Sequence, residues 1–530
     1  MLKDNLVKFL NENAYDYLLV NSTNEFLAEY NEPEQNARYH LTGFSGSTGE
    51  ALLSKSGDLH LFVDGRYHTQ ADKEAFNFVN VVKLQLGETF LSALTKKIAP
   101  YSKLAIVAGK IPLNFYNNAK KDFSELNIEI IPLNFDPVFK HIEKKPFKNA
   151  PIIDIPISIT GISGKEKILS VQKTLKADEA RLITNPEQIA WLLNKRSYAQ
   201  NFSSSFKAEM VIEKDNYKVF YSNERENYQK YLSETEKTIL YSPKHLSYGD
   251  YLIIKNKSKA VASDDIEAAK AIKNHAELSH LKSCFERTDK VVNAVSKYVN
   301  SASSLTEQEL VKFVEKEFFA QGAVSLSFNT ILASGKNSAL AHYSADMNTV
   351  TPIKQENFVL LDCGAYFEGG YATDITRVFC FGEPSKTSKT VYTTVLKANL
   401  NAYHTKFTEN LTGFDLDKKA RDIISANLPD SYNFNHSTGH GVGISVHEFP
   451  PSISPSETVK TPLKNGMVFT IEPGAYNPDF GGVRLENTVC IENNKIVSLS
   501  KMHFEEKLID RSLLSKQELK WLEEWQKEAI

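Results

Sequence analysis

The pattern of apolar and polar positions predicts alternating helices and strands over the first half of the chain. A stretch with apolar residues three and four apart, typical of an amphipathic helix, is followed by a short apolar run typical of a strand, and this order occurs twice. The matching segments are 1–12 and 165–177 for the helices, 17–20 and 181–183 for the strands, and 59–67 and 217–223 for later strands. We therefore expect two related α/β domains.

Two changes in the pattern predict domain boundaries. Residues 144–156 are rich in proline and lysine and have no helical period, which is typical of a linker. A second change lies near residue 265, and residues 268–299 then predict one long helix. The expected domains are 1–150, 151–265 and 266–530.

Composition agrees with a multidomain globular protein. The 530 residues correspond to about three domains of roughly 150 residues each. The 62 basic and 65 acidic residues include no basic block, so we expect neither nucleic acid nor anionic lipid as a partner. No stretch approaches the roughly 20 apolar residues of a membrane span, so no membrane segment is expected.

The cysteines and the N-terminal segment predict a cytoplasmic protein. The four cysteines are too few and too irregularly spaced for a disulfide framework or a zinc ribbon, so we expect reduced, buried thiols. The first residues lack the apolar core and the cleavage site of a signal peptide. The glycine-rich residues 43–49 fit neither phosphate-loop spacing, and we expect a turn that joins strands.

Candidate chemistry is concentrated in three segments of the last third. An apolar run ends at Asp362, and Asp374 follows across a predicted hairpin. A carboxylate at the end of a buried strand is costly unless it is paired or binds a metal. The second segment contains His436, His440 and His447, three of the 13 histidines in the chain, among glycines that argue against a helix. A lone histidine is more often structural, but this clustering favours a site.

The third segment adds two carboxylates and an arginine. Glu472 follows an apolar run, while Arg484 and Glu486 are two residues apart and should share one strand face. The alternative is a solvent-facing ion pair, and Asp374 with Arg377 would form a similar one. Taken singly, each residue is as consistent with that alternative as with a functional role.

Charge counting favours one metal centre built from all three segments. Asp362, Asp374, Glu472 and Glu486 would balance two divalent cations, with His440 as a neutral fifth ligand. A set dominated by oxygen favours Mn²⁺, although one imidazole is also compatible with Zn²⁺ or Co²⁺.

These segments resemble the metallopeptidase family with the pita-bread fold, which includes aminopeptidase P, prolidase and methionine aminopeptidase. The family's five ligands, two Asp, one His and two Glu in this order, fall on the residues just named. Similarity to the long, three-domain form of aminopeptidase P continues outside the site, at 43–47, 64–67, 160–163, 189–192 and 508–510. The resemblance implies two α/β domains of the creatinase/prolidase N-terminal type, then an α+β pita-bread catalytic domain with a C-terminal tail.

Two intervals depart from the family pattern. The hairpin between Asp362 and Asp374 is one residue longer than usual, which a bulge would absorb while keeping both carboxylates on one face. The stretch from His440 to His447 is shorter than in the animal three-domain enzymes.

The resemblance also implies an activity, which is hydrolysis of the N-terminal Xaa-Pro bond of peptides by water activated between two metal ions. It implies that Glu472 transfers the proton, that His447 donates a hydrogen bond to the developing oxyanion, and that His342 lies at the substrate pocket. Locally, His342 is equally compatible with a structural turn histidine. His436, Tyr476 and Arg484 would contact substrate or support the ligands, and the family implies a homodimer.

Two alternatives remain open at this stage. A prolidase would use the same metal centre on Xaa-Pro dipeptides, but the two preceding domains and the long tail favour an aminopeptidase. A catalytically inactive, peptidase-like module would bind another protein. Five intact ligands argue against it, because clustered carboxylates are costly and a binding module has no use for them.

Overall fold

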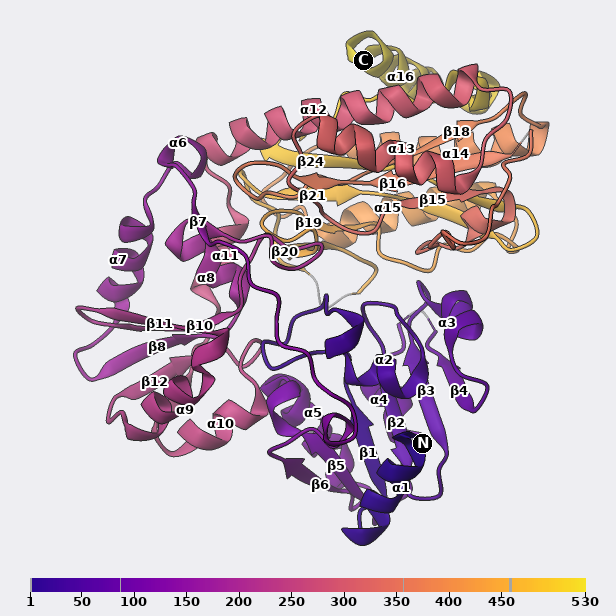
Figure 1. Ribbon diagram of the computed structural model, residues 1–530. Coiled ribbons are helices and arrows are strands. Elements are labelled where there is room, and N and C mark those ends of the chain that lie inside the picture. Colours follow the sequence, from indigo (N-terminus) through magenta and orange to yellow (C-terminus); the bar gives the residue numbers. More distant parts are fainter. Residues whose placement is uncertain (1, 86, 356, 457–459) are drawn as a thin grey trace. The chain divides into compact units, whose positions relative to one another are not determined.

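The computed structural model describes residues 2–85, 87–355, 357–456 and 460–530 (Figure 1). The chain divides into two compact units, and each contains segments that are distant in sequence. The first unit consists of Met1–Ile153, Ile162–Gln200 and Ser205–Ile266, and the second of Asp154–Gly161, Asn201–Ser204 and Glu267–Ile530. Within the described ranges, no helix combines the length and the apolar character needed to cross a membrane.

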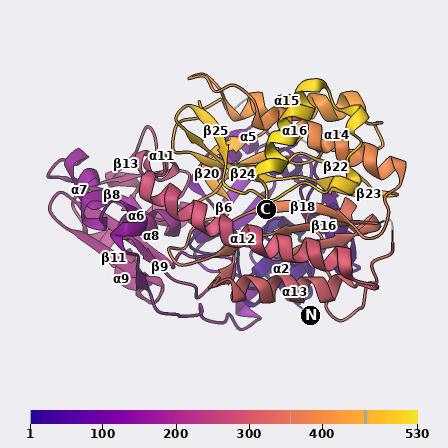
Figure 2. The same cartoon turned by 90° about the horizontal axis from the view of Figure 1, so that it is seen from above.

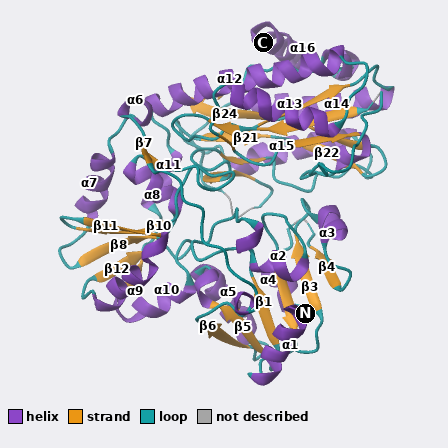
Figure 3. Cartoon of the chain, in the orientation of Figure 1, coloured by secondary structure: helices purple, strands orange, loops and turns teal. Residues whose placement is uncertain are grey.

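The first unit contains two sheets with the same core topology (Figure 3). In one sheet, β1 (Tyr17–Val20) runs antiparallel to β2 (Glu50–Ser54) and parallel to β5 (Lys103–Val107). In the other, β8 (Glu179–Ile183) has the same relation to β10 (Ala208–Glu213) and β12 (Thr238–Tyr241). The outer strands are β3 (Leu59–Val63), β4 (Val79–Lys83) and β6 (Glu129–Leu133) in the first sheet, and β11 (Tyr217–Tyr221) and β13 (Ser258–Ala260) in the second. The structure therefore contains the predicted duplication, with β3 and β11 as the matching later strands.

The helices of this unit begin where the sequence supplies capping residues. Helix α7 (Gly164–Thr174) starts after a capping box at Ser163, and α8 (Pro186–Leu193) starts with proline after the N-cap Asn185. The remaining α-helices here are α1 (Leu2–Glu12), α2 (Ala37–Thr42), α3 (His68–Glu74), α4 (Phe90–Thr95), α5 (Leu113–Ser124), α9 (Arg225–Glu234) and α10 (Tyr248–Ile254). Residues 43–49 connect α2 to β2, so the prediction of a turn between two strands was wrong; the short helix ends at Gly43, where φ is +80°.

The predicted long helix at 268–299 is two helices, α11 (Asp265–Ala271) and α12 (His275–Ser301). The break has a local cause. The side chain of Asn274 accepts hydrogen bonds from the backbone of Ala276 and Glu277, and Glu277 reaches back to the N–H of Asn274. This capping box starts a new helix, so the single-helix prediction was wrong.

The second unit contains the sheets that position the candidate site. Their orders are β15-β16-β18, β20-β19-β21-β24-β25, β14-β17 and β22-β23. The strands are β14 (Ser325–Leu326), β15 (Ile331–Ser334), β16 (Phe358–Cys363), β17 (Ala365–Tyr366), β18 (Ile375–Cys380), β19 (Gly439–Gly441), β20 (Glu448–Ile453), β21 (Val468–Ile471), β22 (Gly474–Asn477), β23 (Gly481–Arg484), β24 (Asn487–Glu492) and β25 (Lys495–Ser498). The accompanying helices are α6 (Ile157–Thr160), α13 (Glu307–Ala320), α14 (Lys386–Tyr403), α15 (Gly413–Asn427) and α16 (Lys516–Glu528).

Strands β16 and β18 are buried on both faces. Val359 and Leu361 face a core cluster that includes α12 and α13, which pack along each other (Figure 2). Leu360 and Val378 face a second cluster that includes α14 and α15. Because side chains alternate along a strand, Asp362 lies on the face of Leu360.

The hairpin that carries the two aspartates contains no bulge between β16 and β18. The ladder is regular from Phe358↔Cys380 to Cys363↔Ile375. The turn that follows contains Gly369 and Gly370, whose φ angles are 94° and 67°, and these are values that glycine adopts readily. The expected bulge was therefore wrong, because glycines in the turn accommodate the length.

Candidate metal centre

The five residues predicted as ligands lie in short strands or directly next to a strand. Asp362 lies in β16 and Asp374 immediately precedes β18, while His440 lies in β19. Glu472 immediately follows β21, and Glu486 immediately precedes β24.

The structure brings these residues together in one buried cluster. Ligand atoms of Asp374, His440 and Glu486 lie within 4.8 Å of one another. The Nε2 atom of His440 is 3.6 Å from Asp374 Oδ2 and 3.5 Å from Glu472 Oε1. Asp362 is connected to Glu472 through Arg484, whose guanidinium contacts both carboxylates.

Two of the carboxylates have one oxygen held by the protein and one without a protein partner. Asp362 Oδ2 accepts a hydrogen bond from Arg484 at 2.6 Å, and Glu486 Oε2 accepts one from Thr376 at 2.8 Å. Their other oxygens, Asp362 Oδ1 and Glu486 Oε1, are buried without a hydrogen-bond donor. Such an acceptor is costly unless a cation or another donor meets it, so these atoms fit a metal ion.

The orientation of His440 also fits a metal ligand. Its Nδ1 lies 3.0 Å from the carbonyl oxygen of Gly441, a contact that requires Nδ1 to carry the proton. In the neutral ring the lone pair is then on Nε2, the atom directed toward the carboxylates. Metal-binding histidines are commonly oriented by a backbone carbonyl in this way.

Burial and mutual repulsion raise the pKa values of the clustered carboxyl groups. Burial, followed by the charges of Glu486, Asp362 and Glu472, raises the pKa of Asp374 well above its usual value. Burial and the charges of Glu472 and Asp362 likewise raise the pKa of Glu486 well above its usual value. Divalent cations would relieve this repulsion, because they favour the ionised form of every carboxylate around them.

Arg484 organises one side of the cluster. Its guanidinium donates to Asp362, to the Thr376 hydroxyl at 3.2 Å and to the Tyr476 hydroxyl at 2.8 Å. The Tyr476 hydroxyl also lies 2.8 Å from His436 Nε2. The predicted residues His436, Tyr476 and Arg484 therefore form one connected network beside the carboxylates.

The alternative interpretation, in which Arg484 and Arg377 form solvent-facing ion pairs, was wrong. Arg484 is 3% exposed and Glu486 1% exposed, and both contact Thr376 as expected for residues on one face. Arg377 lies on the opposite face of β18 from Thr376 and donates to the carbonyl oxygens of Met502 and His503. It therefore forms no pair with Asp374.

The two remaining predicted histidines, His447 and His342, have different surroundings in the structure. The rings of His447 and His440 lie 4.6 Å apart and are nearly perpendicular. Burial raises the pKa values of Asp362 and Glu472, while the charge of Arg484 and, to a smaller extent, that of His447 lower them. His342 lies half-buried in the loop after β15, next to Tyr343. Its role at the substrate pocket stays a prediction.

Thr376 is the site residue that the sequence interpretation missed. It accepts from Arg484 and donates to Glu486, and thereby joins two predicted residues. A signal was present, since Thr376 is two residues after Asp374 and shares its strand face.

Comparison with known proteins identifies domains that cover most of the chain. Residues 3–135 and 143–277 each match the creatinase/prolidase N-terminal domain, and residues 279–493 match metallopeptidase family M24. Xaa-Pro aminopeptidase 1 of Dictyostelium discoideum is 28% identical over 590 residues, which cover 99% of this chain and 91% of the relative. Aminopeptidase P2 of Arabidopsis thaliana is 27% identical over 572 residues, covering 93% of this chain and 79% of the relative.

A solved structure shares the fold. It is the X-prolyl aminopeptidase of Caenorhabditis elegans, described as a cytosolic enzyme with a di-nuclear active site. It aligns with a TM-score of 0.87 at 24% identity, over 96% of this chain and 90% of that one. The predicted architecture, α/β domains of the creatinase/prolidase type followed by an α+β pita-bread domain, is confirmed.

Proposed function

We propose that this chain, which belongs to the M24 metallopeptidases and carries two creatinase/prolidase N-terminal domains, is a metal-dependent aminopeptidase. It hydrolyses the N-terminal Xaa-Pro bond of peptides, as the names of its relatives indicate for them. The observation that carries the proposal is the buried cluster of carboxylates and one imidazole, in which two carboxylate oxygens lack a donor.

The proposed ligands of two divalent cations are Asp362, Asp374, His440, Glu472 and Glu486. Four carboxylate charges would balance two such ions, and the oxygen-rich set supports Mn²⁺ as the resident metal. When bound, the ions supply an activated water and polarise the scissile carbonyl.

The chain's own groups would carry the proton and hold the substrate. Glu472 would move the proton from the attacking water to the leaving nitrogen, since its carboxylate lies within the cluster, 3.5 Å from His440 Nε2. His447 would donate a hydrogen bond to the carbonyl oxygen as its charge develops. Arg484 would keep Asp362 and Tyr476 in place, and His342, His436 and Tyr476 would lie on the substrate side.

Several broader assignments are also proposals. Three family matches support a division into three domains, proposed as 1–150, 151–265 and 266–530, although the second match, at residues 143–277, extends past both proposed boundaries. A cytoplasmic location is supported by the four buried free thiols, and the family resemblance supports a homodimer. The expected partners are peptides with proline at position two.

The specificity follows from the chemistry of the Xaa-Pro bond. Its amide has no N–H, and the proline ring restricts φ, so proteases that bind extended backbone handle it poorly. An enzyme that cleaves this bond needs a pocket for the ring, acidic groups near the free amine and space beyond proline. We therefore expect rapid cleavage of Arg-Pro-Pro, little cleavage of Arg-Ala-Pro and none of acetylated Arg-Pro-Pro.

The measurement is release of free arginine by the Mn²⁺-loaded full-length chain, with Asp374→Asn as the inactive control. Faster hydrolysis of Gly-Pro than of Arg-Pro-Pro would identify a prolidase instead. Cleavage of the acetylated peptide would exclude an aminopeptidase. No hydrolysis of any peptide by protein shown to contain two metals per chain would identify an inactive binding module.

A further inference from the structure

Glu448, the residue after His447, holds a buried charge that the proposed reaction does not use. Its side chain is 1% exposed. Lys270 Nζ lies 2.6 Å from Oε2, and Lys273 forms a second ion pair with Oε1. Both lysines are 4% exposed, so the three charges form a buried group inside the second unit.

The loop that leads to His447 is folded around this carboxylate. The Ile444 N–H donates to Glu448 Oε2 at 3.1 Å. A Cβ atom at Gly443 would collide with the Glu448 carboxylate, so glycine permits the close approach. At the end of the loop, His447 contacts the ring of His440. The loop between the two histidines is therefore shaped by its interaction with Glu448.

The two lysines come from the break between α11 and α12. Lys270 lies in the last turn of α11 and Lys273 lies in the break. The Lys273 N–H donates to the carbonyl oxygen of Gly466 at 2.8 Å, while Asn274 starts α12. The interruption of the helix thus places both lysines where they can form ion pairs with Glu448.

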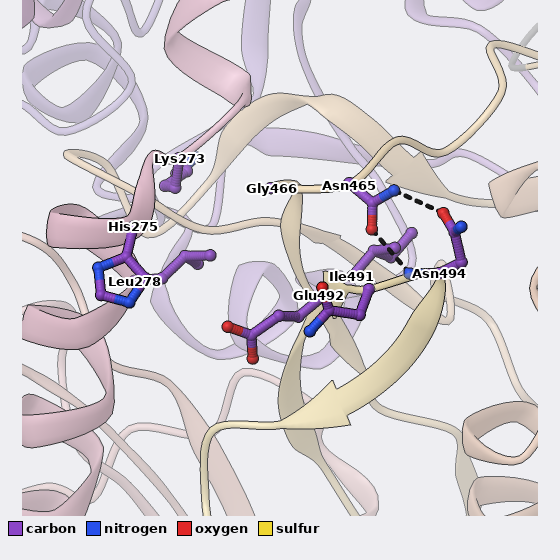
Figure 4. Close-up of a pocket in the computed structure, with 9 residues that line it drawn as sticks. Lys273, His275, Leu278, Asn465, Gly466, Ile491, Glu492 and Asn494 are labelled. Atoms are coloured by element: carbon purple, nitrogen blue, oxygen red, sulfur yellow. Dashed lines mark hydrogen bonds between the residues drawn. The ribbon is translucent and has the colours of Figure 1, made fainter.

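A pocket of about 410 Å³ lies beside Lys273, at the start of α12 (Figure 4). Lys273 and Glu492 line it, and Asn465 and Asn494 form hydrogen bonds of 2.6 and 2.9 Å across its wall. Glu492 pairs with the half-exposed Lys282 rather than with the buried lysines. It is therefore a matched carboxylate for comparison with Glu448.

The Glu448 carboxylate stays ionised despite its burial. Burial alone would raise its pKa, but the ammonium groups of Lys270 and Lys273 lower it to about 2. An ionised, doubly paired carboxylate resists displacement, because moving it would separate opposite charges in a buried setting.

We propose that Glu448 is a positioning residue, which Lys270 and Lys273 hold so that the loop 441–447 presents His447 to the scissile carbonyl oxygen. This inference rests on the proposed function and on the proposed role of His447. It adds a requirement that the metal cluster alone does not impose, since none of the three charged residues is among the proposed ligands.

The kinetic test compares Glu448→Gln with Glu492→Gln on Arg-Pro-Pro. A misplaced hydrogen-bond donor costs roughly 10- to 100-fold in rate, so Glu448→Gln should lower kcat by that factor with little change in KM and with two metals still bound per chain. Glu492→Gln should match the wild type. Equal kcat values for Glu448→Gln and the wild type would overturn the proposal.

A double-mutant cycle distinguishes positioning from general stabilisation. If Glu448 acts through His447, Glu448→Gln should cause no further loss of kcat in a His447→Ala background. The same fold-loss in both backgrounds would show that Glu448 acts independently of His447. Because Glu448→Gln leaves two buried ammonium groups, a Glu448→Gln/Lys270→Met/Lys273→Met variant provides a charge-balanced form in which the same loss of kcat is expected.

A second measurement does not depend on activity. Hydrogen exchange of the metal-free full-length chain should be at least about tenfold faster at the Ile444 amide in Glu448→Gln than in the wild type, while exchange in β16 is unchanged. Unchanged exchange at Ile444 would also overturn the proposal. If the wild type hydrolyses no peptide, the proposed function fails, and this exchange result still decides whether Glu448 holds the loop.

Discussion

Individual hydrogen bonds decide which oxygen atoms of the cluster are available to a metal. The Thr376 hydroxyl donates its single proton to Glu486 Oε2 and accepts from Arg484. Arg484 in turn holds Asp362 Oδ2. One hydroxyl therefore orients two carboxylates, and each keeps its other oxygen directed to the interior without a donor.

Removal of this hydroxyl should weaken metal binding. Thr376→Val keeps the shape of the side chain but removes the hydrogen-bond donor of Glu486 and one of the three acceptors of Arg484. Loss of such supporting partners typically costs roughly 10- to 100-fold in metal affinity, so a loss in this range is expected in competition with a chelator. Thr390→Val, at a partly exposed position on α14, is the control. Equal affinity in the two variants would contradict the supporting role of Thr376.

At the scale of elements, the C-terminal helix α16 is attached to the catalytic unit through aromatic rings. Trp521 stacks on His404, at the end of α14, with ring centroids 4.4 Å apart and planes 6° from parallel. Trp525 contacts Tyr403 edge-on and donates its indole N–H to the carbonyl oxygen of Met502 at 3.1 Å. The stacked ring of His404 is thus part of the attachment.

This attachment should weaken in mild acid. Burial lowers the pKa of His404 from 6.5 to about 4. Because the folded-state pKa is depressed, the stability contributed by the neutral ring is present above pH 6.5 and is lost as the pH falls toward 4. Two of the three tryptophans lie on α16, so we expect a change in tryptophan fluorescence over this range. The change should be absent in His404→Phe, which stacks but does not titrate, and its persistence there would assign it to another group.

At the scale of the whole molecule, the catalytic unit is not a continuous part of the chain. Residues 154–161 and 201–204 belong to it, although they lie within the N-terminal half of the sequence. Ser204 Oγ lies 2.6 Å from the carbonyl oxygen of Gly370 and 3.0 Å from that of Ile444. It therefore links the hairpin between the two aspartates to the loop before His447.

Loss of this link should destabilise the catalytic unit. Ser204→Ala leaves two buried carbonyl groups without their shared donor, at a cost of about 1–3 kcal/mol, so the Tm of the full chain should fall by several degrees. Ser301→Ala, at the exposed end of α12, is the control. A fragment of residues 267–530 lacks both inserted segments and should melt below the Ser204→Ala variant. A fragment as stable as the full chain would show that these segments contribute nothing.

The sequence by itself determined the strand and helix periods, the duplication of the first two domains and the identity of the clustered residues. These follow from local patterns, because alternation defines the face of a strand, as for Asp362, and capping residues define where helices begin. The break at Asn274 was also readable, since Asn274 and Glu277 have the spacing of a capping box. Apolar residues at helical spacing on both sides of Asn274 led instead to the prediction of one continuous helix.

Only the tertiary structure decided which charges meet. Lys273 and Glu448 are 175 residues apart, and Thr376 and Glu486 are 110 apart. The inclusion of residues 201–204 in the catalytic unit is similarly invisible from sequence. Local periodicity specifies the face on which a side chain lies, whereas its partner depends on how distant strands and loops pack. For this reason the sequence predicted the proposed ligands, and the structure was needed to show the residues that hold them in place.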